Sequence, residues 1–168
     1  MNNVTLIGMP GAGKSTVGVL LAKTLGFDFL DTDILLQQQK GALLQQILDT
    51  LGPEGFLDAE EAMLTKLDCR GTVIAPGGSA VCREGAMARL GRLGPVVYLR
   101  LPCAEIEQRL ANISSRGVVM APGQTIRDLY DQRSPLCERY ADLIVDAGGQ
   151  TPEDTVSAVL HRLQTIQK

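Results

Sequence analysis

The residues with the clearest chemical potential lie near the N-terminus, in the stretch VTLIGMPGAGKST from Val4 to Thr16. It carries the pattern G-x-x-x-x-G-K-S from Gly8 to Ser15, the P-loop. Glycines let backbone N–H groups turn inward around a phosphate, Lys14 brings charge to the β- and γ-phosphates, and the Ser15 hydroxyl is suited to ligate Mg²⁺. We therefore expect a nucleoside triphosphate to be held by Gly11, Ala12, Gly13, Lys14, Ser15 and Thr16.

A P-loop functions only between a strand and a helix, and the sequence predicts both. The apolar run Val4–Ile7 predicts a strand that leads into the loop. The segment Thr16–Leu25 predicts a helix, and Gly26 is placed to end it as a C-terminal cap. The positive end of this helix would add to phosphate binding.

Two carboxylates, Asp31 and Asp33, follow the next predicted strand, Phe27–Leu30. Ligands bind at the carboxyl ends of strands in open α/β sheets, so these side chains suit a role near Mg²⁺ and a phosphoryl acceptor. Equally, Asp33 precedes a helical pattern that starts at Ile34, and it would serve there as an N-terminal cap. The spacing alone supports both interpretations.

Three helical pieces are predicted before the next strand, over residues 34–39, 42–51 and 56–67, with a turn at 52–55. They exceed what one crossover needs, so we expect a small substrate-binding helical region at about 33–67. The apolar run Thr72–Ala75 predicts a buried parallel strand. Gly77 and Gly78 follow it, and they form either a ligand-binding backbone segment or a simple turn.

The rest of the chain continues the alternation of helix and strand. Helices are predicted over 83–93, 104–113, 125–140 and from 151, and strands over 95–101 and 143–146. Residues 114–124 lack periodicity and carry glycines and an arginine, which is typical of a lid. The sequence therefore predicts one domain over 1–168 of the α/β class: a three-layer fold with a five-stranded, mainly parallel sheet and helices on both faces.

Charge and hydropathy narrow the function. The net charge of −3 and the pI near 5.2 argue against a nucleic-acid partner or an anionic membrane surface. No apolar run approaches the roughly 18 residues of a membrane span, and no signal peptide is recognisable. The four cysteines are far apart with no C-x-x-C pair, which favours reduced thiols in a cytosolic protein. In this acidic chain, arginines gather around the predicted lid at Arg109, Arg116, Arg127 and Arg133. Such cations suit phosphoryl transfer to a small molecule.

These motifs together resemble the shikimate kinase family over essentially the whole chain. The resemblance is carried by the P-loop, by the D-x-D of Asp31 and Asp33, and by E-x-F-x-x-x-E at Glu54, Phe56 and Glu60. It continues in V-I-A-x-G-G at 73–78, in the arginine pair Arg109 and Arg116, and in R-x-P-L-x-E-x-x-A-D at 133–142. It implies a monomeric cytoplasmic enzyme of aromatic amino acid biosynthesis that uses ATP and Mg²⁺ to phosphorylate shikimate to shikimate 3-phosphate.

The resemblance also implies roles for single residues. Lys14, Asp33 and Arg116 would be catalytic, with Asp33 on the reacting hydroxyl and Arg116 closing from the lid onto the γ-phosphate. Asp31 would hold Mg²⁺ through water, beside Ser15. Arg109 would lie against the adenine. The acceptor would be bound by Asp33, Glu60, Arg133 and the backbone of Gly77 and Gly78, with Leu57 at a further acceptor-side position.

The chain departs from the family pattern in four places. Leu57 stands where the family has a second arginine for the acceptor carboxylate, and Ser79 stands where it has a third glycine. The lid reads Arg116-Gly117-Val118-Val119 in place of R-P-L-L, and Gln150 lies near a missing adenine-side arginine. Loss of one charge-assisted hydrogen bond predicts shikimate binding weaker by about 10- to 100-fold, unless another cation such as Arg83 replaces it.

Two alternatives stay open from the sequence. One is a related kinase for another small hydroxylated acid, sugar acid or hydroxy amino acid. The other is a nucleotide-binding regulatory or degenerate module, although Lys14, Ser15 and Asp33 are all present.

Overall fold

The computed structural model describes residues 3–111 and 117–166. Its five strands form one sheet in the order β2-β3-β1-β4-β5, and every neighbouring pair is parallel. The strands are β1 (Asn3–Ile7), β2 (Asp28–Asp31), β3 (Thr72–Ala75), β4 (Val96–Arg100) and β5 (Leu143–Asp146). The predicted α/β class and five-stranded sheet are confirmed.

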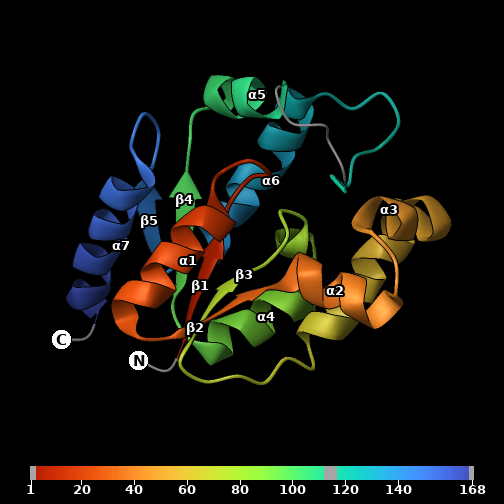
Figure 1. The fold of residues 1–168 in the computed structure, drawn as a ribbon. Coiled ribbons are helices and arrows are strands. Elements are labelled where there is room, and N and C mark those ends of the chain that lie inside the picture. Colours follow the sequence, from red (N-terminus) through yellow and green to blue (C-terminus); the bar gives the residue numbers. More distant parts are fainter. Residues whose placement is uncertain (1–2, 112–116, 167–168) are drawn as a thin grey trace.

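Helices cover both faces of this sheet (Figure 1). α1 (Lys14–Leu25) and α7 (Pro152–Ile166) contact each other on one face. α4 (Glu84–Leu93) and α6 (Ile126–Tyr140) cover the other, where α4 packs on β1 and α6 on β4. The result is the predicted three-layer arrangement.

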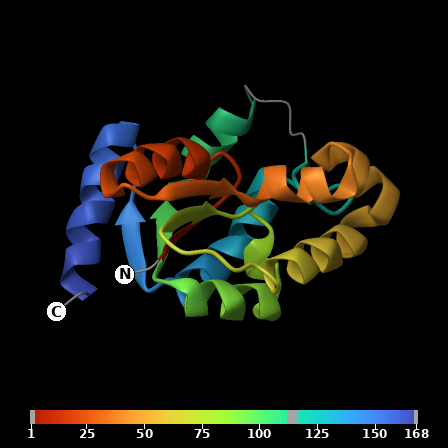
Figure 2. The ribbon, with the colours of Figure 1, turned by 60° about the horizontal axis from the view of Figure 1, so that its bottom comes forward.

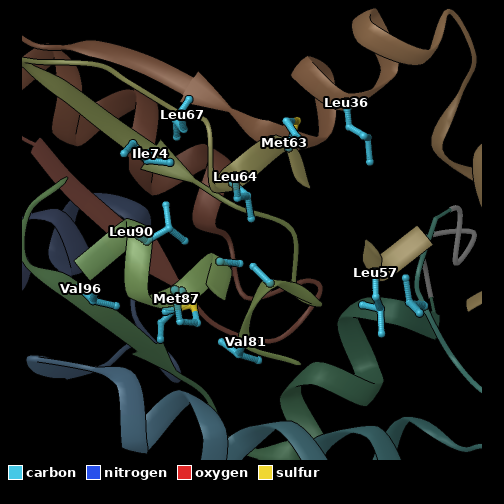
Figure 3. Close-up of a cluster of buried hydrophobic side chains, with 14 of the residues drawn as sticks. Leu36, Leu57, Met63, Leu64, Leu67, Ile74, Val81, Met87, Leu90 and Val96 are labelled. Carbon is cyan, nitrogen blue, oxygen red and sulfur yellow. The ribbon is translucent and has the colours of Figure 1, made fainter. Parts of the chain in front are cut away.

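The layers are held together because successive strand residues point to opposite faces. In β4, Val97 and Leu99 belong to the apolar cluster with α1 and α7, whereas Val96 and Tyr98 belong to the cluster with α4. Figure 3 shows part of this second cluster, which reaches from Val96 and Leu90 out to Leu36 and Leu57. The sheet is therefore buried on both faces, as parallel sheets are.

The remaining helices lie around the carboxyl ends of the strands. They are α2 (Thr32–Lys40), α3 (Leu44–Leu64), the short 3₁₀ helix η1 (Ala80–Cys82) and α5 (Cys103–Ala111). In both ribbon views α2 and α3 lie on the opposite side of the molecule from α7 (Figures 1 and 2). The sequence did not predict η1.

One predicted boundary is wrong. The two helical pieces predicted on either side of residues 52–55 are both present within α3, but the break between them is Gly52 alone and not a four-residue turn. Gly52 takes a left-handed φ of 71° and bends the chain, and Pro53 then occupies the first turn of the second helical part. Proline is tolerated there because an N–H at that position has no partner within its helix.

In the two described ranges, every helix is too short or too polar to cross a membrane.

Candidate active site

A hollow of about 280 Å³ lies at the carboxyl ends of β2 and β3, and the P-loop forms one of its borders. Most of the residues that the sequence singled out line it: Gly11, Gly13, Lys14, Ser15, Thr16, Asp31, Asp33, Gly77, Gly78 and Arg133. Ala12, Leu57, Glu60 and Arg109 are not part of its lining, and Arg116 lies outside the described residues. The hollow therefore joins the phosphate-binding loop to the predicted acceptor residues.

The P-loop has the geometry that phosphate binding needs. Gly13 precedes α1 with a left-handed φ of 89°, which turns the chain from the loop into the helix. The ammonium of Lys14 donates hydrogen bonds to the carbonyls of Gly8 (2.9 Å) and Met9 (2.8 Å). Burial lowers the pKa of Lys14, and nearby Asp33 opposes that shift. The cation is thus positioned before any phosphate arrives.

Asp31 occupies a point where the P-loop, β2 and α2 meet. Its Oδ2 accepts a hydrogen bond from the Ser15 hydroxyl at 2.8 Å, and its Oδ1 accepts from the N–H groups of Asp33 (2.9 Å) and Ile34 (3.4 Å). Asp31 is therefore the N-terminal cap of α2, and the interpretation of Asp33 as that cap is wrong. The Asp33 carboxylate instead contributes to the hollow.

Asp33 and Glu60 converge on Gly77. A Cβ built at Gly77 would lie 2.7 Å from Asp33 Oδ1 and 2.8 Å from Glu60 Oε1, so a side chain at this position would displace both carboxylates from where they lie. Burial, reinforced by the charge of Asp31, raises the pKa of Asp33 to about 6. Burial also raises the pKa of Glu60 to about 7. Both groups can therefore exchange protons near neutral pH.

Arg133 brings a cation to the same hollow from α6. It is 3% exposed, its Nη2 donates to the carbonyl of Val119, and its Nε has no hydrogen-bond partner among the described residues. Burial lowers the pKa of Arg133 from its ordinary value. A buried guanidinium with an unused N–H is suited to bind a carboxylate.

Leu57 lies on α3 next to the hollow's Phe56. Its side chain is 8% exposed and belongs to the apolar cluster drawn in Figure 3. Val119 is another member of that cluster. Arg83, considered as a substitute cation, instead donates to Glu54 (2.9 Å) and Asp58 (2.8 Å) and is not part of the hollow's lining. Arg133 is therefore the only arginine that lines the hollow within the described residues.

The described part of the predicted lid closes one side of the hollow. Gly117, Val118 and Val119 contribute to the lining, and the N–H of Gly117 donates to Gln45 Oε1 of α3 at 3.1 Å. The first lid residues, 114–116, lie outside the described residues.

Arg109 lies beside the P-loop. Its Nη1 donates to the carbonyl of Gly11 at 3.2 Å, and its Nη2 donates to Glu105 Oε1 at 2.6 Å. Glu105 Oε2 in turn accepts from the N–H of Gly149 at 3.1 Å. Sequence reasoning missed Glu105, and the i, i+4 spacing of Glu105 and Arg109 on α5 was the signal available.

A second contact that the sequence did not indicate joins Ser79, which lines the hollow, to Glu60 of α3. The Ser79 hydroxyl donates to Glu60 Oε2 at 2.7 Å, and both side chains are buried. Nineteen positions separate the two residues, so no local pattern predicts the contact.

Known proteins match this chain over almost its full length. The family model described as shikimate kinase matches residues 10–164. A shikimate kinase of Pseudomonas paraeruginosa is 41% identical over 169 residues, which cover 99% of this chain and 98% of the relative. Among solved structures, a shikimate kinase from Acinetobacter baumannii in complex with shikimate has a TM-score of 0.88 and 31% identity, covering 98% of this chain and 94% of that one. Shikimate kinase from Aquifex aeolicus has a TM-score of 0.77 and 26% identity, covering 96% of each chain. The resemblance inferred from the motifs is thereby confirmed: the chain belongs to the shikimate kinase family.

Proposed function

We propose that this protein transfers the γ-phosphoryl group of ATP to a hydroxyl of shikimate, giving shikimate 3-phosphate. The observation that carries the proposal is the single hollow that joins Lys14 of the P-loop, Asp33 and Arg133. These three groups supply a phosphate-binding cation, a proton acceptor and a carboxylate-binding cation. That set matches an acceptor with both a hydroxyl and a carboxylate.

The phosphate end of the hollow supports phosphoryl transfer. Lys14 and the N–H groups at the start of α1 would meet the charge that spreads over the phosphoryl oxygens in the transition state. The Lys14 ammonium is already held by the carbonyls of Gly8 and Met9, so it needs little reorganisation when the nucleotide binds. On the adenine side we assign Arg109, and on the γ-phosphate Arg116.

Mg²⁺ fits the oxygen atoms at Ser15 and Asp31. The two side-chain oxygens lie 2.8 Å apart at the edge of the hollow, and Mg²⁺ prefers hard oxygen ligands with several retained waters. The described residues contain no group of three or more His, Cys, Asp or Glu side chains that could bind a metal. We therefore propose that Ser15 ligates the ion directly and that Asp31 holds it through water, with phosphate oxygens as further ligands. Bound there, the ion would neutralise charge on the phosphates.

The acceptor end supports a hydroxylated carboxylic acid. The Asp33 carboxylate would accept a hydrogen bond, and then the proton, from the attacking hydroxyl. Arg133 would pair with the acceptor's carboxylate, and the backbone N–H groups of Gly77 and Gly78 would contact its other oxygens. We take residues of about 33–67 as the acceptor-binding region and about 114–124 as the lid, because Gly117 of the lid contacts Gln45 of that region. By family likeness we further propose a monomeric cytoplasmic enzyme of aromatic amino acid biosynthesis.

Leu57 leaves a second acceptor as a candidate, because one arginine lines the hollow within the described residues where the family pattern has two. A related hydroxylated acid that needs a single guanidinium would then compete with shikimate. The test is ADP release measured with shikimate, gluconate, serine, threonine and homoserine at matched concentrations. We expect the highest kcat/KM with shikimate, and a tenfold higher value with any other compound would reassign the acceptor.

A further inference from the structure

The Glu60 carboxylate is buried without an ion-pair partner. Its residue is 2% exposed, and no lysine or arginine of the described residues lies within 4.0 Å of its oxygens. Burying a carboxylate is costly unless it is paired or hydrogen-bonded. Some other group must therefore hold this one in place.

That group is the hydroxyl of Ser79. It donates to Glu60 Oε2 at 2.7 Å, it is itself 4% exposed, and it is the only hydrogen-bond donor to the Glu60 carboxylate within the described residues. Because Ser79 follows the Gly77-Gly78 segment directly, this bond ties α3 to the backbone that faces the acceptor.

The other oxygen of Glu60 lies beside Gly77, which lines the hollow. Oε1 is buried, has no hydrogen-bond partner in the described residues, and approaches the same side of Gly77 as Asp33 Oδ1. The charged groups that face Glu60 are Asp33 of α2, Lys14 of α1 and Arg133 of α6. Rotation of the Glu60 carboxylate would therefore change the field around both the proton acceptor and the carboxylate-binding cation.

The identity of residue 57 explains why a hydroxyl is needed. Leu57 lies one helical turn before Glu60, on the same side of α3, and an arginine there would reach Glu60 as well as the acceptor. Leucine offers no donor, and its side chain is buried in the apolar cluster. The nearby Arg133 donates a hydrogen bond from Nη2 to the carbonyl of Val119, not to Glu60.

We propose that Ser79 is a positioning residue that holds the Glu60 carboxylate over Gly77, and that it compensates for the absence of an arginine at Leu57. This inference rests on the proposed function, because it assumes that the Gly77 side of the hollow binds the acceptor. It makes residues 57 and 79 a coupled pair: a cation at 57 makes the hydroxyl at 79 dispensable.

The kinetic test is a double-mutant cycle with Ser79→Ala and Leu57→Arg. Ser79→Ala alone should raise the KM for shikimate about five- to tenfold, because a hydrogen bond to a charged group is lost, and leave the KM for ATP within about twofold. In the Leu57→Arg background the same substitution should change the KM for shikimate less than about twofold. Equal effects in both backgrounds would overturn the coupling. Thr155→Ala is the matched control, because it removes a buried hydroxyl that donates to the carbonyl of Thr151, just before α7 and away from the hollow.

A second readout does not depend on turnover. The carboxyl carbon of Glu60 can be followed by NMR in ¹³C-glutamate-labelled protein, with Glu60→Gln to assign its signal. The Ser79 hydrogen bond favours the charged form, so Ser79→Ala should move the titration midpoint of Glu60 to higher pH by roughly one unit. Thr155→Ala should leave the midpoint in place.

The two readouts separate the possible failures. An unchanged midpoint in Ser79→Ala would overturn the positioning role even if shikimate is phosphorylated. A shifted midpoint together with no turnover of shikimate would support the Ser79–Glu60 contact and overturn the proposed function.

Discussion

At the scale of single residues, the site depends on how burial changes the chemistry of ordinary side chains. Asp33 shares the space over Gly77 with Glu60 and faces Lys14 across the hollow. Its carboxylate is near Lys14 but forms no ion pair among the described residues, so it remains able to accept a proton.

Asp33→Asn tests this assignment. Asparagine has nearly the same shape and would still fit against Gly77, but it cannot accept the proton of the attacking hydroxyl. We expect kcat to fall by about 10²- to 10⁴-fold with ATP affinity changed only a few-fold, measured by ADP release and by nucleotide titration. Turnover like that of the wild type would remove Asp33 from the catalytic residues.

Arg133→Ala tests the carboxylate-binding role. Loss of the guanidinium should raise the KM for shikimate about 10- to 100-fold and the KM for ATP far less. Arg133→Lys is the matched control, since it keeps the charge and loses the forked geometry, and an intermediate effect is expected. Equal effects on both substrates would contradict the assignment.

Leu57→Arg tests the cost of the missing cation. A guanidinium that reaches the hollow from α3 should raise kcat/KM for shikimate about tenfold or more. Arg83 is engaged with Glu54 and Asp58, so it does not already supply this charge. The comparison needs kcat/KM of both proteins at one pH, and an unchanged value would mean that a second cation adds nothing to binding.

At the scale of elements, the nucleotide side is held together by contacts between segments far apart in the chain. Glu105 of α5 accepts from the N–H of Gly149 between β5 and α7, and it also pairs with Arg109, which bonds Gly11 of the P-loop. One carboxylate therefore connects three segments around the expected adenine position.

Glu105→Ala should release both contacts. We expect the KM for ATP to rise about three- to tenfold, because Arg109 and the segment at Gly149 lose their common anchor, with the KM for shikimate unchanged. Glu107→Ala on the same helix is the control, since Glu107 pairs with exposed Arg127 instead. Matching effects of the two variants would point to a general loss of helix stability.

At the scale of the whole molecule, the buried carboxyl group of Glu60 makes the free energy of unfolding fall as pH rises. The pKa of Glu60 is about 7 in the folded protein and 4.5 in an ordinary exposed glutamate. Between these values the folded state binds more protons than the unfolded state, so the free energy of unfolding falls as pH increases. The contribution is fully present below about pH 4.5 and lost above about pH 7.

Glu60→Gln isolates this effect. Relative to the variant, the wild type should lose roughly 3 kcal/mol of unfolding free energy between pH 4.5 and 7.5, measured by urea denaturation at several pH values. Glu153→Gln, at an exposed glutamate of α7, should keep the slope of the wild type. Parallel pH profiles for the wild type and Glu60→Gln would show that Glu60 titrates alike in both states.

The predictions that failed rested on short sequence patterns that are compatible with two different local structures. Glycine and proline at 52–53 are typical of a turn, but Gly52 bends the chain in a single residue and Pro53 fits the turn that follows. Asp31 and Asp33 are both spaced to cap α2, and the meeting of β2 with the P-loop selects Asp31. Such choices depend on neighbours outside the segment.

By itself, the sequence determined the alternation of strands and helices, the P-loop and the kinase family. Those features follow from hydrophobic periodicity, from glycine at left-handed positions and from motifs whose residues are neighbours in the chain. The tertiary structure alone decided that Glu60 is held by Ser79, that Arg83 is engaged elsewhere and that Glu105 anchors Gly149. These contacts join residues 19, 29 and 44 positions apart, and their partners are set by how the elements pack. The motifs that bind the nucleotide could therefore be identified from the sequence, whereas the contacts that position Glu60, Arg83 and Glu105 required the fold.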